Sequence, residues 1–194
     1  LFPACQGAET QPPPADAAMV RDSDPPPRPD GPVVDHRVDP PVMMTLATFN
    51  VHDLFDEVDD PLHEDLILSS TAAAGKLAAV GKALRAVNAD VIALQEVENK
   101  AILDRLNAQE LKAQGYSHVR LYEGNDMRGI NVALLSRFPI IRTVSHAQDR
   151  FPGVDGDTKM HAFSRDCLEM IIEPAAGRQL VLLVNHLRAT ESTD

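Results

Sequence analysis

Strand-like and helix-like patterns alternate in the first half of the folded sequence. β-Branched and aromatic residues mark the strands, and apolar residues at helical spacing mark the helices. The predicted order is a strand over 42–50, an acidic loop over 52–65, a helix capped by Thr71, a buried strand over 91–94 and a helix over 101–113 that ends before Gly115. Strands that alternate with helices are typical of an α/β fold.

After Gly115 the pattern changes to strands separated by turns. The candidate strands are 116–122, 131–136, 140–146, 163–172 and 179–187. The runs 132–135 and 180–184 are continuously apolar, which predicts that both faces of these strands are covered. A layered sandwich with two sheets inside and helices outside fits this pattern.

The first 41 residues differ in composition from the rest. They hold 11 of the 15 prolines and few large apolar side chains, which predicts a disordered or extended linker over 1–41 and a folded domain over 42–194. Removing the linker's three basic and seven acidic residues from the totals of 18 and 29 leaves the domain a net charge of −7. Such a domain cannot hold nucleic acid by bulk charge, so an anionic substrate needs local arginines or a metal.

Cys5 follows a short run of apolar and small residues. This pattern predicts a secreted or cell-surface bacterial protein, with Cys5 as a possible lipid anchor; the alternative is a cysteine of no consequence in a disordered tail. Cys167 lies in an apolar alternation that predicts a small buried residue. No apolar run approaches the length of a transmembrane segment.

Two carboxylates, Glu96 and Glu98, stand where the buried strand 91–94 should leave its sheet. In α/β proteins this edge carries the binding chemistry, and Mg²⁺ prefers carboxylate oxygens together with water and phosphate. The alternative is a solvated strand end. The sequence does not match other common motifs. Gly75-Lys76 lacks the remainder of a phosphate-binding loop, and the acidic loop lacks the ligand spacing of an EF-hand. Neither a Cys-x-x-Cys pair for zinc nor a Gly-x-Ser-x-Gly nucleophile elbow occurs.

Five sequence blocks occur in an order that resembles the endonuclease/exonuclease/phosphatase superfamily, which has the DNase I-like fold. They are Thr48-Phe49-Asn50-Val51, the segment 89–97 with Gln95-Glu96, the segment 128–137 with Arg128-Gly129-Ile130-Asn131, Phe163-Ser164-Arg165-Asp166, and Val184-Asn185-His186-Leu187. Leu54-Phe55-Asp56 is similar to the branch of secreted bacterial nucleases. The resemblance implies a four-layer α/β sandwich over the folded segment.

The resemblance also implies hydrolysis of phosphodiesters with a divalent metal, Mg²⁺ or else Mn²⁺ or Ca²⁺. Glu96 matches the metal-binding glutamate, Asn50 the asparagine that supports metal and phosphate, Arg165 an arginine suited to a phosphate oxygen, and His186 the first catalytic histidine. Arg128 has no assigned role beyond orienting its loop. We leave the remaining histidines structural: His36, His52, His63, His118, His146 and His161.

Each assignment has an alternative without function. Asn50 could bridge the acidic loop, Arg165 could pair with Asp166 or Glu169 on a surface strand, and His186 could be an ordinary half-buried histidine. The expected substrate is nucleic acid, cut by an extracellular endonuclease. The other possibilities are another phosphoester, for a phosphatase or lipid phosphodiesterase on the same fold, and a non-catalytic interaction domain.

The family pattern continues with a Gly-Asp-x-Asn block and a Ser-Asp-His block, and neither occurs before Asp194. From the resemblance we therefore expect a sandwich incomplete at its C-terminus, a fragment that is inactive alone, and an uncovered face on the strand around 180–184.

Overall fold

The computed structural model describes residues 41–154 and 156–187. Its elements are β1 (Leu46–Leu54), α1 (Ser70–Val87), β2 (Val91–Val97), α2 (Lys100–Gln109), the 3₁₀ turn η1 (Lys112–Gln114), β3 (His118–Leu121), β4 (Asn131–Ser136), β5 (Ile140–Val144), β6 (Phe151–Pro152), β7 (Met160–His161), β8 (Cys167–Ala175) and β9 (Arg178–Asn185). The predicted linker, except for Pro41, and Cys5 lie outside the described residues. Within the described ranges, no helix is both long and apolar enough to cross a membrane.

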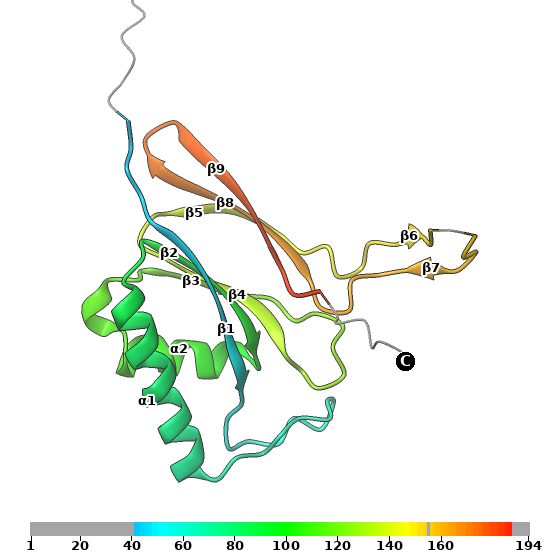
Figure 1. Cartoon of the computed structure of the whole chain (residues 1–194), viewed down its shortest axis with the longest axis horizontal. Coiled ribbons are helices and arrows are strands. Elements are labelled where there is room, and N and C mark those ends of the chain that lie inside the picture. The colour runs from blue at the N-terminus through cyan, green and yellow to red at the C-terminus, as the bar shows by residue number, and fades with distance from the viewer. Residues whose placement is uncertain (1–40, 155, 188–194) are drawn as a thin grey trace, which may run out of the picture. The chain divides into compact units, whose positions relative to one another are not determined.

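One sheet carries both helices on its outer face (Figure 1). Its strand order is β1-β2-β4-β3, with β1 and β2 parallel and β4 antiparallel to both of its neighbours. Apolar side chains of α1 and α2, among them Leu84 and Leu106, form one core with Ile92 and Leu94 of β2. The prediction of an α/β fold is confirmed, and β1-α1-β2 forms a parallel crossover.

The second sheet, ordered β5-β8-β9, is antiparallel and packs on the inner face of the first. Its core joins Val132 and Leu134 of β4 to Leu168 and Met170 of β8. All six residues of β4 are buried, so the prediction that the run 132–135 is covered on both faces is confirmed. The result is a layered sandwich of helices, sheet and sheet.

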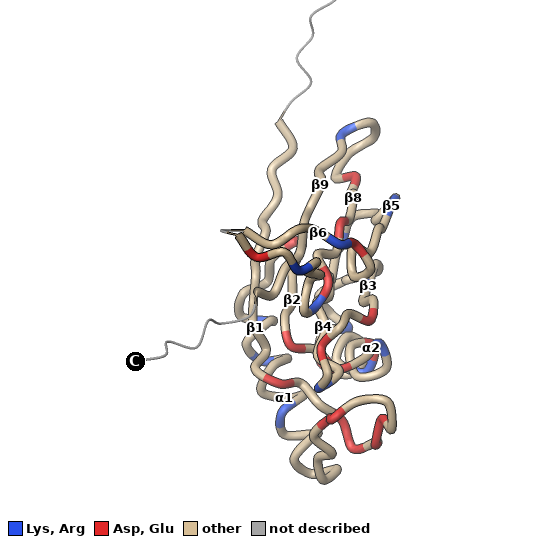
Figure 2. Tube along the Cα trace, turned by 90° about the vertical axis from the view of Figure 1, so that its right-hand side faces the viewer, with Lys and Arg blue, Asp and Glu red and all other residues tan. Residues whose placement is uncertain are grey.

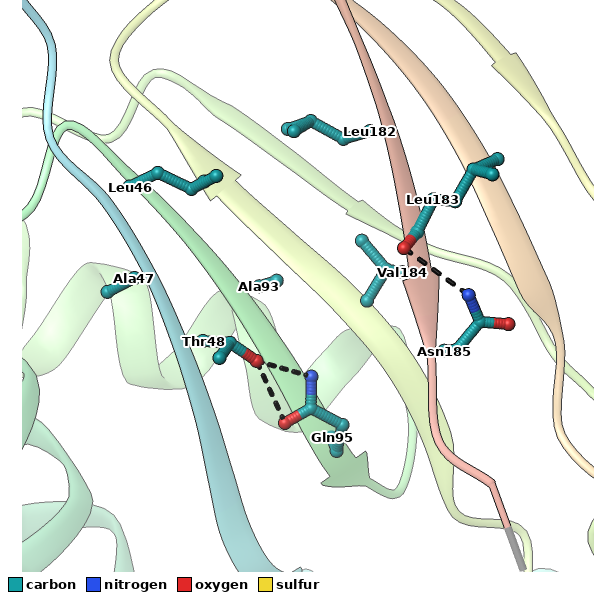
Figure 3. A pocket seen from close by; sticks show the side chains of 9 residues that line it. All are labelled: Leu46, Ala47, Thr48, Ala93, Gln95, Leu182, Leu183, Val184 and Asn185. Atoms are coloured by element: carbon teal, nitrogen blue, oxygen red, sulfur yellow. Dashed lines mark hydrogen bonds between the residues drawn. The ribbon is translucent and has the colours of Figure 1, made fainter.

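One face of β9 is exposed, so the prediction from its apolar run that both faces are covered is wrong, whereas the uncovered face expected from the family resemblance is confirmed. Val184 is buried, but Val181 and Leu183 are 54% and 58% exposed, because no described element covers that side. Between β9 and β1 lies a groove of about 380 Å³ whose lining contains no charged side chain (Figure 3). Within this groove Thr48 and Gln95 hydrogen-bond across β1 and β2.

Several predicted boundaries were wrong for local reasons. β1 continues through the start of the predicted loop to Leu54, because its last residues still pair with β2. Helix α1 is capped by Ser69 rather than Thr71, since the Ser69 hydroxyl accepts the Ala72 N–H at 3.2 Å. The predicted strand over 163–172 begins only at Cys167, which is buried as expected. The helix over 101–113 divides into α2 and η1, and the hairpin of β6 and β7 was not predicted.

Candidate active site

Three residues at the ends of β1 and β2 have positive φ without being glycine. They are His52 at 56°, Asp53 at 59° and Glu96 at 65°. The β1–β2 pairing shifts register between Asn50 and Leu54, and the β2–β4 pairing shifts between Gln95 and Val97. Such bulges redirect side chains, and each strained backbone costs about 1–3 kcal/mol, so they persist mainly where function requires them.

The same three residues form a group that could hold a metal ion. One ligand atom from each of His52, Asp53 and Glu96 lies within 4.8 Å of the other two. Two carboxylates and an imidazole suit a divalent cation, so the donor set fits the metal that the sequence predicts. The sequence alone assigns His52 a structural role and places Asp53 only in an acidic loop. Their position directly after Asn50-Val51, on the strand next to the one that carries Glu96, was the signal that could have identified them.

Asn50 holds this arrangement together. Its Nδ2 donates to Glu96 Oε1 at 2.9 Å, and its Oδ1 accepts the His52 N–H at 2.7 Å. The Asp53 N–H donates to the other Glu96 oxygen at 3.0 Å. Asn50 therefore orients both the glutamate and the bulge; the described contacts place its amide oxygen against backbone.

The Glu96 carboxylate stays ionised. Its partial burial favours the neutral form, but the hydrogen bonds from Asn50 and Asp53 outweigh that effect. The charge of Arg128, and that of His186 at a pH low enough to protonate it, act in the same direction, so the pKa of Glu96 lies below its usual value. A charged carboxylate at neutral pH is what a metal ligand requires.

His186 follows β9 and reaches the same carboxylate from the second sheet. Its Nε2 lies 3.4 Å from Glu96 Oε1. Burial, together with the charge of Arg165, lowers the pKa of His186 although Glu96 acts in the opposite sense. The Nδ1 atom is buried without a hydrogen-bond partner among the described residues. His186 is therefore a neutral imidazole beside the candidate metal ligands.

Two arginines flank the cluster and share Asp126. The Nε of buried Arg165 lies 2.8 Å from Asp126 Oδ2, an ion pair that lacks the alignment of a hydrogen bond. Arg128 lies 3.6 Å from Asp126 Oδ1 and 3.4 Å from Asp53 Oδ1. A hollow of about 480 Å³ is lined by both guanidinium-bearing residues. Arg165 belongs to the segment before β8 and pairs with Asp126, so the alternative of a pair with Asp166 or Glu169 on a surface strand is wrong.

The loop that carries Asp126 and Arg128 is fixed by two residues. Asn131 is buried, accepts the Gly124 N–H at 2.7 Å and donates to the carbonyls of Glu98 and Gly129 at 2.6 and 2.8 Å. A Cβ on Gly124 would lie 2.9 Å from the backbone of Arg165. The absence of a side chain at Gly124 thus allows the two loops to touch.

Glu98 does not join the cluster, although the sequence pairs it with Glu96. It is buried, and its Oε2 accepts the Asp56 N–H at 2.7 Å. Burial raises the pKa of Glu98 to about 7, the hydrogen bond from Asp56 opposes this, and the carboxylates of Asp56 and Asp65 add to it. Glu98 therefore anchors the acidic loop between β1 and α1, where acidic residues gather (Figure 2).

A family model and several solved structures match this chain. The model of the endonuclease/exonuclease/phosphatase family matches residues 45–192. Solved structures that match include TDP2 from Caenorhabditis elegans, with 18% identity over 76% of this chain and 36% of that one and a TM-score of 0.45. A β-hairpin deletion mutant of beta toxin from Staphylococcus aureus matches with 17% identity over 78% of this chain and 54% of that one and a TM-score of 0.47.

The chain thus spans between about a third and a half of the length of these two structures. A comparison with curated proteins finds no match. The family model covers most of the chain, and the sandwich carries the helices and sheets expected of that fold. The chain belongs to the endonuclease/exonuclease/phosphatase family and has its DNase I-like α/β fold.

Proposed function

We propose that this chain forms the metal- and phosphate-binding part of a divalent-metal-dependent phosphodiesterase that cuts nucleic acid. The observation that carries the proposal is the convergence of His52, Asp53 and Glu96 within 4.8 Å, with His186 at 3.4 Å from Glu96. The coarser part, phosphoester hydrolysis with a metal, follows from family membership. Nucleic acid as the substrate rests on the resemblance to secreted nucleases.

Asp53 and Glu96 would hold the cation, with the His52 imidazole as a third donor. Carboxylate oxygens favour Mg²⁺, Mn²⁺ or Ca²⁺, and the imidazole shifts the preference towards Mn²⁺. A bound cation supplies Lewis-acid stabilisation of the charge that develops on the phosphoryl oxygens.

The chain's own cations and its histidine complete the site. Arg165 and Arg128 bind the non-bridging phosphate oxygens, because a guanidinium matches them with two parallel donors. Asp126 holds Arg165 in place. His186, neutral because of its lowered pKa, can hydrogen-bond to the phosphate or take up a proton there. Local arginines thus compensate for the acidic net charge of the domain.

The test is a substrate panel on the protein encoded by the complete gene: plasmid DNA, RNA, a small phosphomonoester and sphingomyelin vesicles, each with and without Mg²⁺ or Mn²⁺. We expect metal-dependent cleavage of nucleic acid and a loss of at least about 10²-fold in kcat in Glu96→Gln. Turnover unchanged in Glu96→Gln would overturn the metal assignment. Exclusive turnover of the monoester or of the lipid would overturn the nuclease.

We further propose that the protein is exported and lipid-anchored through Cys5. Support comes from the small residues before Cys5 and the proline-rich stretch after it. Metabolic labelling with a fatty acid should mark the protein and not its Cys5→Ser variant; equal labelling of the two would refute the anchor.

A further inference from the structure

The β6–β7 hairpin brings aromatic rings beside the candidate active site, and it projects from the sandwich (Figure 1). Phe151 lies with its ring centroid 5.3 Å from that of Phe163 and 6.4 Å from that of His161, the latter in a stacked orientation. Phe163 is fixed by its carbonyl, which accepts the Asn125 Nδ2 at 2.9 Å. His161 is held by Asp157 at 2.7 Å. The rings thus form a positioned aromatic wall.

This wall borders a pocket of about 440 Å³ that ends at the catalytic candidates. Phe151 and Phe163 line one part of it, and Ser164, Arg165, Asn185 and His186 line another. The volume lies within the range of small-molecule sites. One pocket therefore offers apolar ring faces, neutral polar groups, a guanidinium and the carboxylate of Asp166.

Three buried polar atoms without a hydrogen bond belong to residues that line this pocket. The Nε of Arg165 still has its ion pair with Asp126, whereas the Nδ1 of His186 and the Oδ2 of Asp166 have no hydrogen-bond partner among the described residues. Buried polar atoms are satisfied in most proteins, so such atoms mark a place where a polar ligand or an ordered water belongs.

We propose that this pocket is a nucleobase subsite, in which one base stacks on Phe151 and Phe163 while its phosphate lies at Arg165 and His186. The inference rests on the proposed function and adds a reason for choosing nucleic acid over other phosphoesters. Stacking on aromatic side chains accepts any base, because each has a π face, and it contributes about 1–3 kcal/mol per base.

A membrane is the competing partner for an exposed hairpin with apolar residues such as Met160, which is 60% exposed. Binding to an anionic membrane gains strength from an excess of basic residues. The described residues of the hairpin and its flank carry no excess of basic charge, because the positive charges of Arg150 and Lys159 are balanced by the negative charges of Asp149 and Asp157. The polar side chains of Ser164 and Asn185 in the pocket lining would also gain no hydrogen bonds from an acyl chain. These features favour the base.

The test uses binding without turnover. A single-stranded hexanucleotide with one 2-aminopurine is titrated in EDTA, so that stacking quenches its fluorescence and no strand is cut. A matched strand that lacks the base at that position keeps the same phosphates. We expect quenching with the first strand, binding about 5- to 100-fold weaker in Phe151→Ala, and recovery in Phe151→Trp, which restores a ring. Tyr122→Ala removes an exposed aromatic ring outside the pocket and should bind as the unmodified protein does.

Equal affinity for the two strands, or unchanged quenching in Phe151→Ala with an unchanged melting temperature, would overturn the subsite. So would loss of binding to phosphatidylglycerol vesicles, rather than to the oligonucleotide, in the same variant. Glu96→Gln should still quench 2-aminopurine. If nucleic acid is never cut but quenching persists, the proposed nuclease activity is wrong and the base subsite stands. If nucleic acid is cut but the abasic strand binds equally well, the base subsite is wrong and the nuclease activity stands.

Discussion

Asn50 and Glu96, on neighbouring parallel strands, are joined by a hydrogen bond of 2.9 Å from the asparagine Nδ2 to the glutamate Oε1. The same asparagine accepts the N–H of His52 through its Oδ1. One uncharged side chain thereby ties the bulge of β1 to the carboxylate of β2. The candidate metal ligands therefore come from two strands, and their arrangement depends on the residue that joins these strands.

Replacing Asn50 should weaken the metal site without removing a charged ligand. In Asn50→Ala, Glu96 loses the donor that most favours its ionised form, so the pKa of Glu96 rises. We expect Mn²⁺ affinity to fall by about 10- to 100-fold, as for other residues that orient metal ligands. Titration calorimetry at neutral pH checks this. Mn²⁺ bound by Asn50→Ala with the affinity of the unmodified protein would contradict the orienting role.

Glu98 should make folding stability depend on pH. Its pKa is about 7 in the folded protein, against 4.5 for a glutamate side chain surrounded by water, so the folded state binds the additional proton between these values. The contribution of Glu98 to stability is complete below pH 4.5 and is lost as the pH rises through 7. The melting temperature of Glu98→Gln should therefore rise relative to that of the unmodified protein as the pH increases from about 5 to about 8. A difference in melting temperature that stays constant with pH would contradict the burial of an ionisable group.

Gly124 should tolerate no side chain, whereas Gly75 should. A Cβ at Gly124 would lie 2.9 Å from the Arg165 backbone, so Gly124→Ala should cost about 1–3 kcal/mol and loosen the Arg165–Asp126 pair. Gly75 lies in α1 with nothing within 4 Å of its Cβ position, so Gly75→Ala should stabilise the fold by about 0.5–1 kcal/mol. Urea unfolding measures both. Two changes of the same sign would contradict the close approach of the loops.

His186 should titrate below the ordinary histidine range. Burial and Arg165 both lower the pKa of His186 and Glu96 raises it, so Arg165→Met should raise that pKa and Glu96→Gln should lower it. NMR titration of the imidazole signals resolves the shifts, with His146 as the internal control because Asp149 raises its pKa. Shifts of the same sign in the two variants would show that His186 does not lie between these charges.

The sequence predicted most of the fold because its signals are local. The apolar run 132–135 became the fully buried β4, and the helical spacing around Leu77 and Leu84 became α1. The apolar run of β9 did not predict its exposed face, because an apolar run shows that a strand can be buried and not whether another element packs against it. Ser69 and Thr71 are both capable caps, and only the hydrogen bond to Ala72 decides between them.

The candidate site was predictable where one residue type carries the signal. Glu96 stood out as a carboxylate at a strand end, and Asn50, Arg165 and His186 through their blocks. His52 and Asp53 could not be assigned to the metal site, because their position there depends on two β-bulges that residue propensities do not predict. The pairing of Arg165 with Asp126 joins two loops about 40 residues apart and depends on Gly124, which a single sequence shows only as a glycine.

Direct measurement of metal binding shows whether Glu96 is a metal ligand. Mn²⁺ is titrated into the unmodified protein, Glu96→Gln and Glu98→Gln, and the bound ion is followed by electron paramagnetic resonance. We expect one Mn²⁺ per chain, an affinity at least about tenfold weaker in Glu96→Gln, and little change in Glu98→Gln, whose side chain faces the acidic loop. If Glu96→Gln bound Mn²⁺ with the affinity of the unmodified protein, Glu96 would not be a metal ligand.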